Sequence, residues 1–439
     1  MANNHETAKI SPVVLDFFPH NPYPPRTGAH HRCMQIIEGL RDLGCKVFFC
    51  SSTLFSETTW NTDARNELLK AGLSDVLVHE PSWHDLKVQV LMSRSYKKLK
   101  RPIPLDSIYY TPPGLRRWFS RLVHRIRPDI VLINYAYWGA LAGKGCRRSI
   151  KVIDYHDILS INRVMRRAIM QHLPPTPIDA EDVEEAVVTE DFFSGLNFPE
   201  LENEMRIFDR FDYTLCITSH EAELINDRTT RTKTITLPVT MKTYPMRNTY
   251  KGPALFPTGP NPFNVQGYVY LVRKVLPLVR QVMENPLIVV TGSCCEQVQP
   301  ATGIELAGHI NDMRTLYADA GFVVCPIFGG TGQQIKIVEA MANGLPVVAL
   351  RRAAEATPLE HGISGWVAED AAGFAEGMVR LWRDRDLCRS MGEEGRKKIE
   401  RHFSAERTKS SLWALLEDIG FKKGAITTNE RRIADSDIS

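Results

Sequence analysis

Short runs of apolar residues, separated by helix-like stretches, recur along the whole chain and constrain most strongly what this sequence can fold into. In the first half they are VVLDF (13–17), KVFFC (46–50), DVLVH (75–79), DIVLI (129–133), IKVID (150–154), YTLCI (213–217) and TITL (234–237). In the second half they are LIVVTG (287–292), GIELAG (303–308), GFVVCPI (321–327) and LPVVAL (345–350). Such runs are typical of parallel strands that are buried on both faces. The sequence therefore predicts an α/β fold.

Prolines between residues 238 and 264 divide the chain into two halves, because they interrupt regular elements there. At 439 residues, the chain is also longer than one hydrophobic core usually supports. We expect two Rossmann-like domains at 1–240 and 265–421, a hinge without regular elements at 241–264, and a flexible tail at 422–439. A helix at about 268–283 would open the second domain, and ligands would bind in a cleft between the carboxyl ends of the two sheets.

The composition excludes several classes of protein. Hydrophobic residues make up 43% and charged residues 24%, as in globular proteins, and the net charge of +3 requires no nucleic acid partner. Nine cysteines lie scattered without a metal-binding repeat, so we interpret them as reduced thiols. The N-terminus carries His5, Glu6 and Lys9 where a secretory signal would be apolar, and no apolar stretch approaches the ~20 residues of a membrane-spanning helix. We therefore expect a cytoplasmic protein.

A glycine-rich stretch, GGTGQQIKIVEAMANGLPVV at 329–348, is the strongest candidate for a ligand site. It joins the apolar run at 321–327 to a predicted helix, so it is a strand-to-helix turn. Its glycines allow the backbone to approach a ligand closely, and the amides of the first helical turn favour an anion. Lys336 adds a positive charge in that turn.

Lys336 and Glu339 share one face of this predicted helix, while Ile335, Val338 and Ala342 face the sheet. A diphosphate suits the loop and Lys336, although neither a P-loop nor a GxGxxG pattern is present. Glu339 would repel phosphate, but it can accept hydrogen bonds from two neighbouring hydroxyls, as on a ribose. The pattern indicates a nucleotide site, and a tight turn with a weak exposed Lys–Glu pair is the alternative.

The same region resembles the donor-binding domain of the retaining GT-B glycosyltransferases known as group 1 glycosyltransferases. The likeness covers about residues 255–418, from FPTGPNPFNVQGYVYLVRKVLPLV through GHINDMRTLYADAG and the glycine-rich stretch to HGISGWVAED and MGEEGRKKIERHFS. The resemblance implies that the second domain binds a nucleotide-sugar donor and the first an acceptor. In that family, the Lys matching Lys336 contacts the donor diphosphate and the Glu matching Glu339 holds the ribose.

Two departures from the family pattern affect the expected site. Many members carry a sugar-contacting Glu at the position of Thr331, so the donor sugar does not follow from the resemblance. Many also have an Arg that shares the diphosphate with the Lys, whereas Arg273 lies in the pattern of a packed helix. The expected donor-binding residues are Gly28, Gly329, Gly330, Thr331, Gly332, Gln333, Lys336 and Glu339.

Gly28 and His156 are the candidates in the first half. Gly28 lies just before a predicted helix, where the resemblance implies that its backbone contacts the distal phosphate, and an ordinary proline-rich turn is the alternative. His156 follows the run at 150–154, and a His in this neighbourhood of the family approaches the donor sugar. We expect His156 to be catalytic together with Lys336, with a buried structural histidine as the alternative. His30 and His31 would point apart on a helix and do not suit one metal.

No convincing DxD motif or cluster of His and Cys supports a metal, so we expect no cofactor. Residues 94–127 contain ten Lys or Arg and one acid. Within them, LRRWFSRLVHRIR (115–127) places its apolar residues on one helical side and its arginines outside that side. This pattern suits contact with an anionic membrane at its inner face, and a core helix with a solvated basic face is the alternative.

These features predict a metal-independent hexosyltransferase that uses a nucleotide sugar in glycan or cell-envelope polysaccharide or glycolipid synthesis. Retention of the anomeric configuration rests on the resemblance alone. The expected partners are a nucleotide-sugar donor and a glycan or lipid-linked acceptor, and no nucleic acid. A nucleotide-sugar epimerase of similar fold and a catalytically silent sugar-nucleotide-binding subunit are the alternatives.

Overall fold

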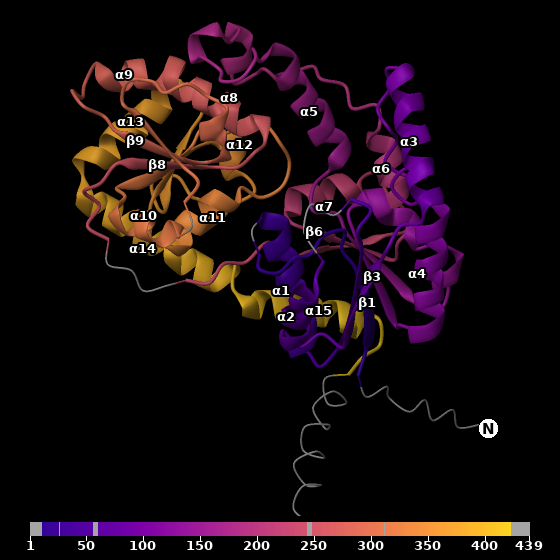
Figure 1. Ribbon diagram of the computed structural model, residues 1–439. Helices are drawn as coiled ribbons and strands as arrows, with labels where there is room; N and C mark the ends of the chain where they lie inside the picture. Colours follow the sequence, from indigo (N-terminus) through magenta and orange to yellow (C-terminus); the bar gives the residue numbers. More distant parts are fainter. Residues whose placement is uncertain (1–10, 26, 56–59, 244–247, 311, 423–439) are drawn as a thin grey trace, which may run out of the picture. The chain divides into compact units, whose positions relative to one another are not determined.

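The computed structural model describes residues 11–25, 27–55, 60–243, 248–310 and 312–422, which form two compact units (Figure 1). Unit 1 contains the described residues from 11 to 157, residues 200–239 and residues 405–422. Unit 2 contains residues 158–199 and 240–404. Each unit is built on one parallel sheet, so the predicted α/β class is confirmed.

The sheet of unit 1 has seven parallel strands in the order β3-β2-β1-β4-β5-β6-β7. They are β1 (Val13–Phe17), β2 (Lys46–Ser52), β3 (Asp75–His79), β4 (Ile130–Asn134), β5 (Ile150–Asp154), β6 (Tyr213–Cys216) and β7 (Lys233–Thr236). In the centre, Val14 pairs with Val47 on one side and with Ile130 on the other, and all three are buried. All seven predicted runs form strands, because each is apolar enough to be covered on both faces.

The helices of unit 1 include α1, whose residues Ile36, Ile37 and Leu40 are buried against the sheet. Gly44 follows α1 with a φ of 81°, a conformation that glycine adopts at little cost. The helices are α1 (Gly28–Asp42), α2 (Thr62–Lys70), α3 (Trp83–Lys98), α4 (Pro113–Ile126), α6 (Leu201–Phe208), α7 (Ser219–Asn226) and α15 (Ala405–Asp418), with 3-10 turns η1 (Ala136–Leu141) and η2 (Lys144–Cys146).

The sheet of unit 2 has six parallel strands in the order β10-β9-β8-β11-β12-β13. They are β8 (Ala254–Thr258), β9 (Ile288–Gly292), β10 (Ile304–Gly308), β11 (Phe322–Cys325), β12 (Val347–Leu350) and β13 (Gly365–Ala368). The sequence predicts β9, β10, β11 and β12, and it misses the other two.

Strand β8 corrects the prediction that 241–264 holds no regular element. It lies inside the sheet although it contains Pro257, which has no amide hydrogen to donate. Its ladder with β11 includes only Ala254 and Leu255, whereas its ladder with β9 continues to Thr258. One side of Pro257 therefore lies beyond the ladder, where the missing amide costs no sheet hydrogen bond.

The helix predicted at about 268–283 is divided in the structure. It begins as α8, continues through the π-helical turn η5 and ends as α9, whose second residue is Pro277. A proline removes an amide donor from the helix, and a local π turn accommodates such a break. The helical segments of unit 2 are α5 (Leu159–His172), η3 (Ala180–Asp182), η4 (Glu185–Val188), α8 (Pro262–Tyr270), η5 (Leu271–Val275), α9 (Leu276–Arg280), η6 (Ser293–Glu296), α10 (Met313–Asp319), α11 (Ile335–Ala342), α12 (Arg351–Ala354), α13 (Ala371–Arg383) and α14 (Arg385–His402).

Two chain segments belong to a different unit from the one that the sequence predicts for them. Residues 158–199 belong to unit 2, where the Gln266 side chain donates a 2.8 Å hydrogen bond to the carbonyl of Val187. Helix α15 belongs to unit 1, where Leu412 fills the space that a Cβ on Gly39 would need. Short-range sequence patterns do not reveal such long-range packing.

An ion pair between Arg32 on α1 and Asp154 at the end of β5 lies in the core of unit 1. Both side chains are at most 1% exposed, and Arg32 Nε lies 2.8 and 2.9 Å from the two carboxylate oxygens. Arg32 Nη1 also donates to the carbonyl of Leu237, directly after β7. One guanidinium thus fastens α1 to two strands.

We predict that Arg32→Met lowers the free energy of unfolding by about 3–5 kcal/mol, because the Asp154 carboxylate would remain buried without its partner. Chemical denaturation at neutral pH measures this value. Lys70→Met removes an exposed ion pair with Glu67 in the same unit and should cost less than about 1 kcal/mol. Equal, small losses for both variants would show that the buried pair does not hold α1 in place.

Candidate functional site

The glycine-rich loop lies at the carboxyl edge of the unit 2 sheet, between β11 and α11. Helix α11 begins at Ile335, and Gln334 at its N-cap provides no side-chain hydrogen bond to the first turn. The amides at this end of α11 therefore have no side-chain cap, which leaves an end that favours an anion. The predicted strand-to-helix turn is confirmed.

The glycines of the loop allow positive φ angles and leave space for neighbouring side chains. Gly330 has a φ of 95° and Gly332 a φ of 83°, which few other residues adopt. A Cβ on Gly329 would lie 2.4 Å from the Phe193 ring and 2.7 Å from the Phe263 ring, so these rings occupy its side-chain space. Packing thus accounts for a glycine at 329, and its contact with a donor stays a prediction.

Helix α5 holds the loop in place. The Thr331 amide donates a 2.8 Å hydrogen bond to Asn162 Oδ1, and the Gly330 amide lies 3.3 Å from the Met165 sulfur. The Thr331 hydroxyl in turn accepts a 3.3 Å hydrogen bond from the Ile158 amide. Because these two loop amides are engaged, the start of α11 is the part of the turn best suited to an anion. The sequence gives no sign of Asn162, since it lies far from the loop along the chain.

Lys336 lies in the first turn of α11 and is partly buried. Its ammonium group donates a 2.5 Å hydrogen bond to Asn264 Oδ1 and lies 4.9 Å from the centroid of the Phe256 ring. Burial lowers the Lys336 pKa, because the charged form loses solvation. Among the residues that the structure describes, Lys336 has no acidic partner. It therefore presents a positive charge that an anion can neutralise.

Asn264 orients this lysine. Its amide nitrogen donates 3.0 Å hydrogen bonds to the carbonyl of Gly259 and to the Asn261 side chain. With the nitrogen so engaged, the oxygen faces Lys336. Asn264 is not among the predicted site residues, although its place at the start of α8, after the capping Asn261, is a usable signal in the sequence.

Arg273 does not accompany Lys336 in the structure. Its guanidinium lies 2.7 Å from Glu185 and donates to the carbonyl of Val183. These contacts hold residues 183–185 against η5. The side chain that contacts Lys336 is the neutral amide of Asn264.

Glu339 lies one turn after Lys336 and is also partly buried. Burial raises its pKa, and its charge helps to raise the pKa of the buried Tyr317. Asn343, four residues after Glu339, is buried and donates to the main-chain oxygen of Glu339 at 2.8 Å. Val338 and Ala342 are buried as predicted, whereas Ile335 is only partly so. The helix thus separates a packed side from a side that carries Lys336 and Glu339.

His156 follows β5 in unit 1 and has a φ of 61°, which is uncommon for a residue with a side chain. Its Nε2 lies 2.8 Å from Asn134 Oδ1 and 3.2 Å from an Asp154 oxygen, and its ring stacks on Tyr135 at 4.2 Å. Burial lowers the His156 pKa to about 4, so the ring is neutral at pH 7. Because both neighbours of Nε2 are acceptors, Nε2 carries the proton and Nδ1 is an acceptor.

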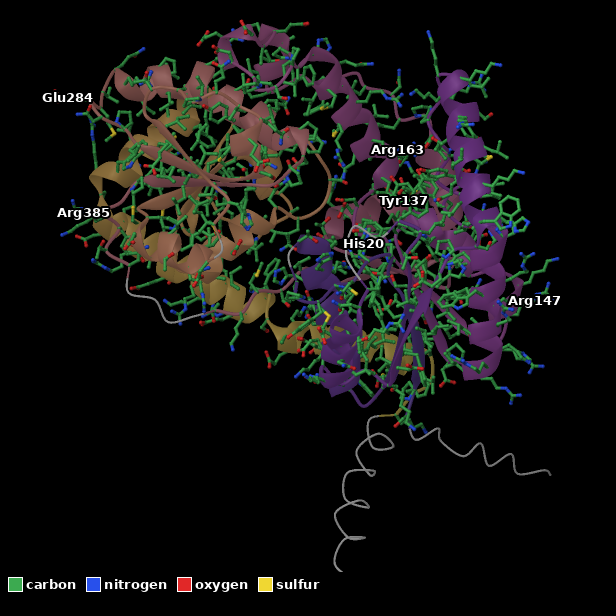
Figure 2. The ribbon with its side chains drawn as sticks, in the orientation of Figure 1. His20, Tyr137, Arg147, Arg163, Glu284 and Arg385 are labelled. Atoms are coloured by element: carbon green, nitrogen blue, oxygen red, sulfur yellow. The ribbon has the colours of Figure 1, made fainter. Side chains whose placement is uncertain are left out.

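Asn134 links His156 to a second buried acid. Its side-chain nitrogen donates to Asp16 Oδ1 at 2.8 Å and to the carbonyl of Phe17 at 2.9 Å, which turns its oxygen toward His156. Burial and the charge of Asp154 raise the Asp16 pKa to about 8, so this carboxyl is mostly protonated at neutral pH. The carboxyl ends of β1, β4 and β5 thus carry a connected buried polar network, and Figure 2 labels His20 and Tyr137 beyond two of these strands.

Gly28 is the first residue of α1, directly after the capping Thr27, whose hydroxyl accepts a 3.3 Å hydrogen bond from the His30 amide. His30 is buried and His31 is exposed, so the two rings point apart as expected. The donor contacts of Gly28, His156, Gly332 and Gln333 stay predictions. Across the described ranges, no group of three or more His, Cys, Asp or Glu is arranged to hold a metal ion.

The basic stretch 94–127 contains α4, whose Leu115, Phe119 and Leu122 are buried in unit 1. The apolar side of this helix is therefore a core face, and its prediction as a membrane-contacting side is wrong. Arg116 donates to the carbonyl of Thr111 at 2.7 Å, while Arg117 remains exposed. No helix in the described part of the chain is long and apolar enough to cross a bilayer.

Part of unit 2 matches a known protein family. Residues 254–384 match the family model for glycosyl transferases group 1. Over 85 residues, the chain is 31% identical to N-acetyl-alpha-D-glucosaminyl L-malate synthase of Bacillus anthracis, a stretch that covers 19% of this chain and 22% of that protein. The chain spans 12–42% of the length of the curated relatives it matches.

Solved structures with similar folds extend over nearly the whole chain. Anabaena Alr3699/HepE, in complex with UDP and glucose, has a TM-score of 0.58 at 13% identity and covers 92% of this chain and 99% of its own. A variant of S. aureus TarM, in complex with fondaparinux, alpha-GlcNAc-glycerol and UDP, has a TM-score of 0.61 at 10% identity and covers 93% of this chain and 100% of its own. At these identities the likeness establishes the GT-B fold. The family match covers residues 254–384, in the unit that carries Lys336 and Glu339, so this part of the chain is similar to the group 1 glycosyltransferases.

Proposed function

We propose that this protein transfers a sugar from a nucleoside-diphosphate sugar to an acceptor, with retention of the anomeric configuration. One observation carries the proposal: Lys336 is a partly buried cation without an acidic partner among the described residues, at the uncapped start of α11 and one turn before Glu339. A diphosphate next to a ribose would satisfy both side chains. The UDP in the HepE complex supports the same donor class.

In the proposed reaction, the bond between the anomeric carbon and the diphosphate oxygen breaks while the acceptor oxygen forms its bond on the same face of the sugar. Negative charge grows on the leaving diphosphate, and the Lys336 ammonium and the amides of α11 stabilise it. The acceptor proton passes to the leaving diphosphate, so no protein nucleophile is needed. Asn264 holds the ammonium in place before the donor binds.

Two residues of unit 1 are proposed to contact the donor. His156 would accept a hydrogen bond from a sugar hydroxyl through Nδ1, because its proton lies on Nε2. The Gly28 amide, at the start of α1, would bind a phosphate oxygen.

The proposed acceptor is a glycan or a lipid-linked sugar in polysaccharide or glycolipid synthesis, and the proposed location is the cytoplasmic side of a membrane. All nine cysteines are free, which suits a reducing compartment. The sugar ligands of the TarM complex support a glycan acceptor. The exposed arginines of the 94–127 stretch would contribute to contact with an anionic membrane surface.

A panel of nucleotide sugars tests the proposal against its alternatives. Incubation with the right donor should release a nucleoside diphosphate and transfer the sugar to an acceptor. An isomerised sugar without release would indicate an epimerase, and binding without turnover would indicate a silent subunit. Either of those outcomes would overturn the proposed transfer.

Lys336→Ala should lower kcat by roughly a hundredfold or more, because the cation stabilises charge that grows only in the transition state. Steady-state kinetics with the identified donor measures the effect, after thermal melting shows that the variant is folded. Lys397→Ala, which removes an exposed lysine from α14 in the same unit, should change kcat by less than about twofold. Near-normal kcat and kcat/KM in folded Lys336→Ala would refute the diphosphate site.

Glu339→Gln should raise the donor KM by about tenfold and change kcat by less than about threefold, because the ribose does not change during the reaction. The variant should melt no earlier than the natural protein, since burial raises the Glu339 pKa and thus disfavours its charged form. Glu394→Gln on the exposed face of α14 is the matched control and should leave the donor KM unchanged. A loss of kcat at unchanged KM would argue against the ribose contact.

Transfer should survive a chelator, because Lys336 and the α11 amides supply the positive field that a metal would otherwise provide. The measurement compares initial rates with and without excess EDTA. A complete loss of activity that added Mg²⁺ or Mn²⁺ restores would contradict this expectation.

A further inference from the structure

Helix α3 is fixed to unit 1 along a narrow inner side. The buried Asp85 carboxylate accepts hydrogen bonds from the Ser82 hydroxyl and from the Gly114 amide of α4, both at 2.8 Å. Gln89 donates to the carbonyl of Tyr109 at 3.4 Å. Asp85 closes a capping box with Ser82 at the start of the helix. These contacts determine which side of α3 faces its unit.

The outer side of α3 exposes large apolar side chains. Trp83 is 62% exposed, Leu86 47%, Val90 46% and Leu91 56%. Their spacing repeats at three to four residues, so they lie on one helical face over three successive turns. In Figure 2, side chains on this side of α3 project away from the rest of the unit. Scattered exposed apolar residues are ordinary, but a contiguous exposed set on one helix face marks an interaction surface.

Cations share this outer face. Lys87 lies 5.3 Å from the centroid of the Trp83 ring, and Arg94, Lys97 and Lys98 follow on the same side in the next turns. Within the described ranges, Arg94, Lys97 and Lys98 form no ion pair. The helix has one acid, Asp85, and it faces inward. The outer face of α3 is therefore apolar over its first turns and positively charged along its length.

We propose that the outer face of α3 binds the interface of an anionic lipid bilayer. Apolar side chains interleaved with Lys and Arg on one helix face are typical of helices that lie in a bilayer interface, where the apolar groups enter the acyl boundary and the cations meet lipid phosphates. A protein partner is less suitable, because interfaces between proteins are depleted in Lys. Single-stranded nucleic acid is also less suitable, because its bases stack on aromatic side chains and Leu86, Val90 and Leu91 are aliphatic. Helix α4 is the weaker surface because its apolar side is buried.

Sedimentation of the full chain with sonicated vesicles tests the proposal. The protein should bind vesicles of equal parts phosphatidylglycerol and phosphatidylcholine in 50 mM salt. It should bind pure phosphatidylcholine vesicles at least about tenfold more weakly, and 500 mM salt should weaken the anionic binding. Absent binding to the anionic vesicles at low salt, or equal binding to both kinds, would overturn the proposal.

Two variants separate α3 from the neighbouring basic helix. Arg94→Gln, Lys97→Gln and Lys98→Gln together should weaken vesicle binding roughly tenfold or more, as should Leu86→Gln, Val90→Gln and Leu91→Gln together. The matched control, Arg117→Gln, Arg121→Gln and Arg125→Gln together, removes as many exposed charges from α4 and should weaken it by less than about threefold. Loss in the α4 variant alone would overturn the assignment to α3.

A separate readout keeps this inference apart from the proposed transfer activity. Without vesicles, the two α3 variants should bind the nucleotide-sugar donor within about twofold of the natural protein, because their side chains are exposed and lie outside the candidate site. Near-normal kcat in Lys336→Ala would refute the diphosphate site without affecting the lipid-binding proposal. Absent vesicle binding would refute the lipid-binding proposal without affecting the diphosphate site. Tighter binding to a single-stranded oligonucleotide than to the vesicles would overturn the lipid assignment.

Discussion

The ion pair between Arg32 and Asp154 is the interaction on which the arrangement of unit 1 depends. It fastens α1 to the carboxyl end of β5 and to the residue after β7, inside a core that excludes water. The same carboxylate lies beside His156 and raises the pKa of Asp16. Burial, together with the Asp154 charge, keeps a proton on Asp16. Burial also keeps His156 neutral against the opposing effect of Asp154, and the Asp154 carboxylate helps to hold the remaining proton on Nε2.

Lys336 in unit 2 provides the contrast. Arg32 meets a carboxylate, whereas Lys336 meets only the neutral oxygen of Asn264. A cation that is compensated serves the fold, and a partly buried cation without an acid nearby is suited to an anionic ligand. This difference, more than the glycines around it, supports the proposed diphosphate site. The glycines chiefly provide backbone conformation and room for Phe193 and Phe263.

Much of this could be predicted from the sequence, and the failures have physical causes. Local apolar patterns predict all strands of unit 1 and the turn before α11, because those elements depend on short-range burial. They miss β8, because a proline argues against a strand, whereas Pro257 lies beyond the end of the ladder with β11. The contacts of Asn264 with Lys336 and of Asn162 with Thr331 join segments distant in sequence, so local patterns do not reveal them. The pattern of α4 is amphipathic, but only the structure shows that its apolar side is a core face and that α3 carries the exposed one.

Calorimetric titration of the chain with a nucleoside diphosphate and its monophosphate, in the presence of a chelator, tests the central claim most directly. The account predicts that the diphosphate binds at least about tenfold more tightly than the monophosphate, because the second phosphate meets Lys336 and the start of α11. It also predicts that Lys336→Ala removes this difference. Equal affinities for the two nucleotides, or a difference that survives Lys336→Ala, would contradict the account.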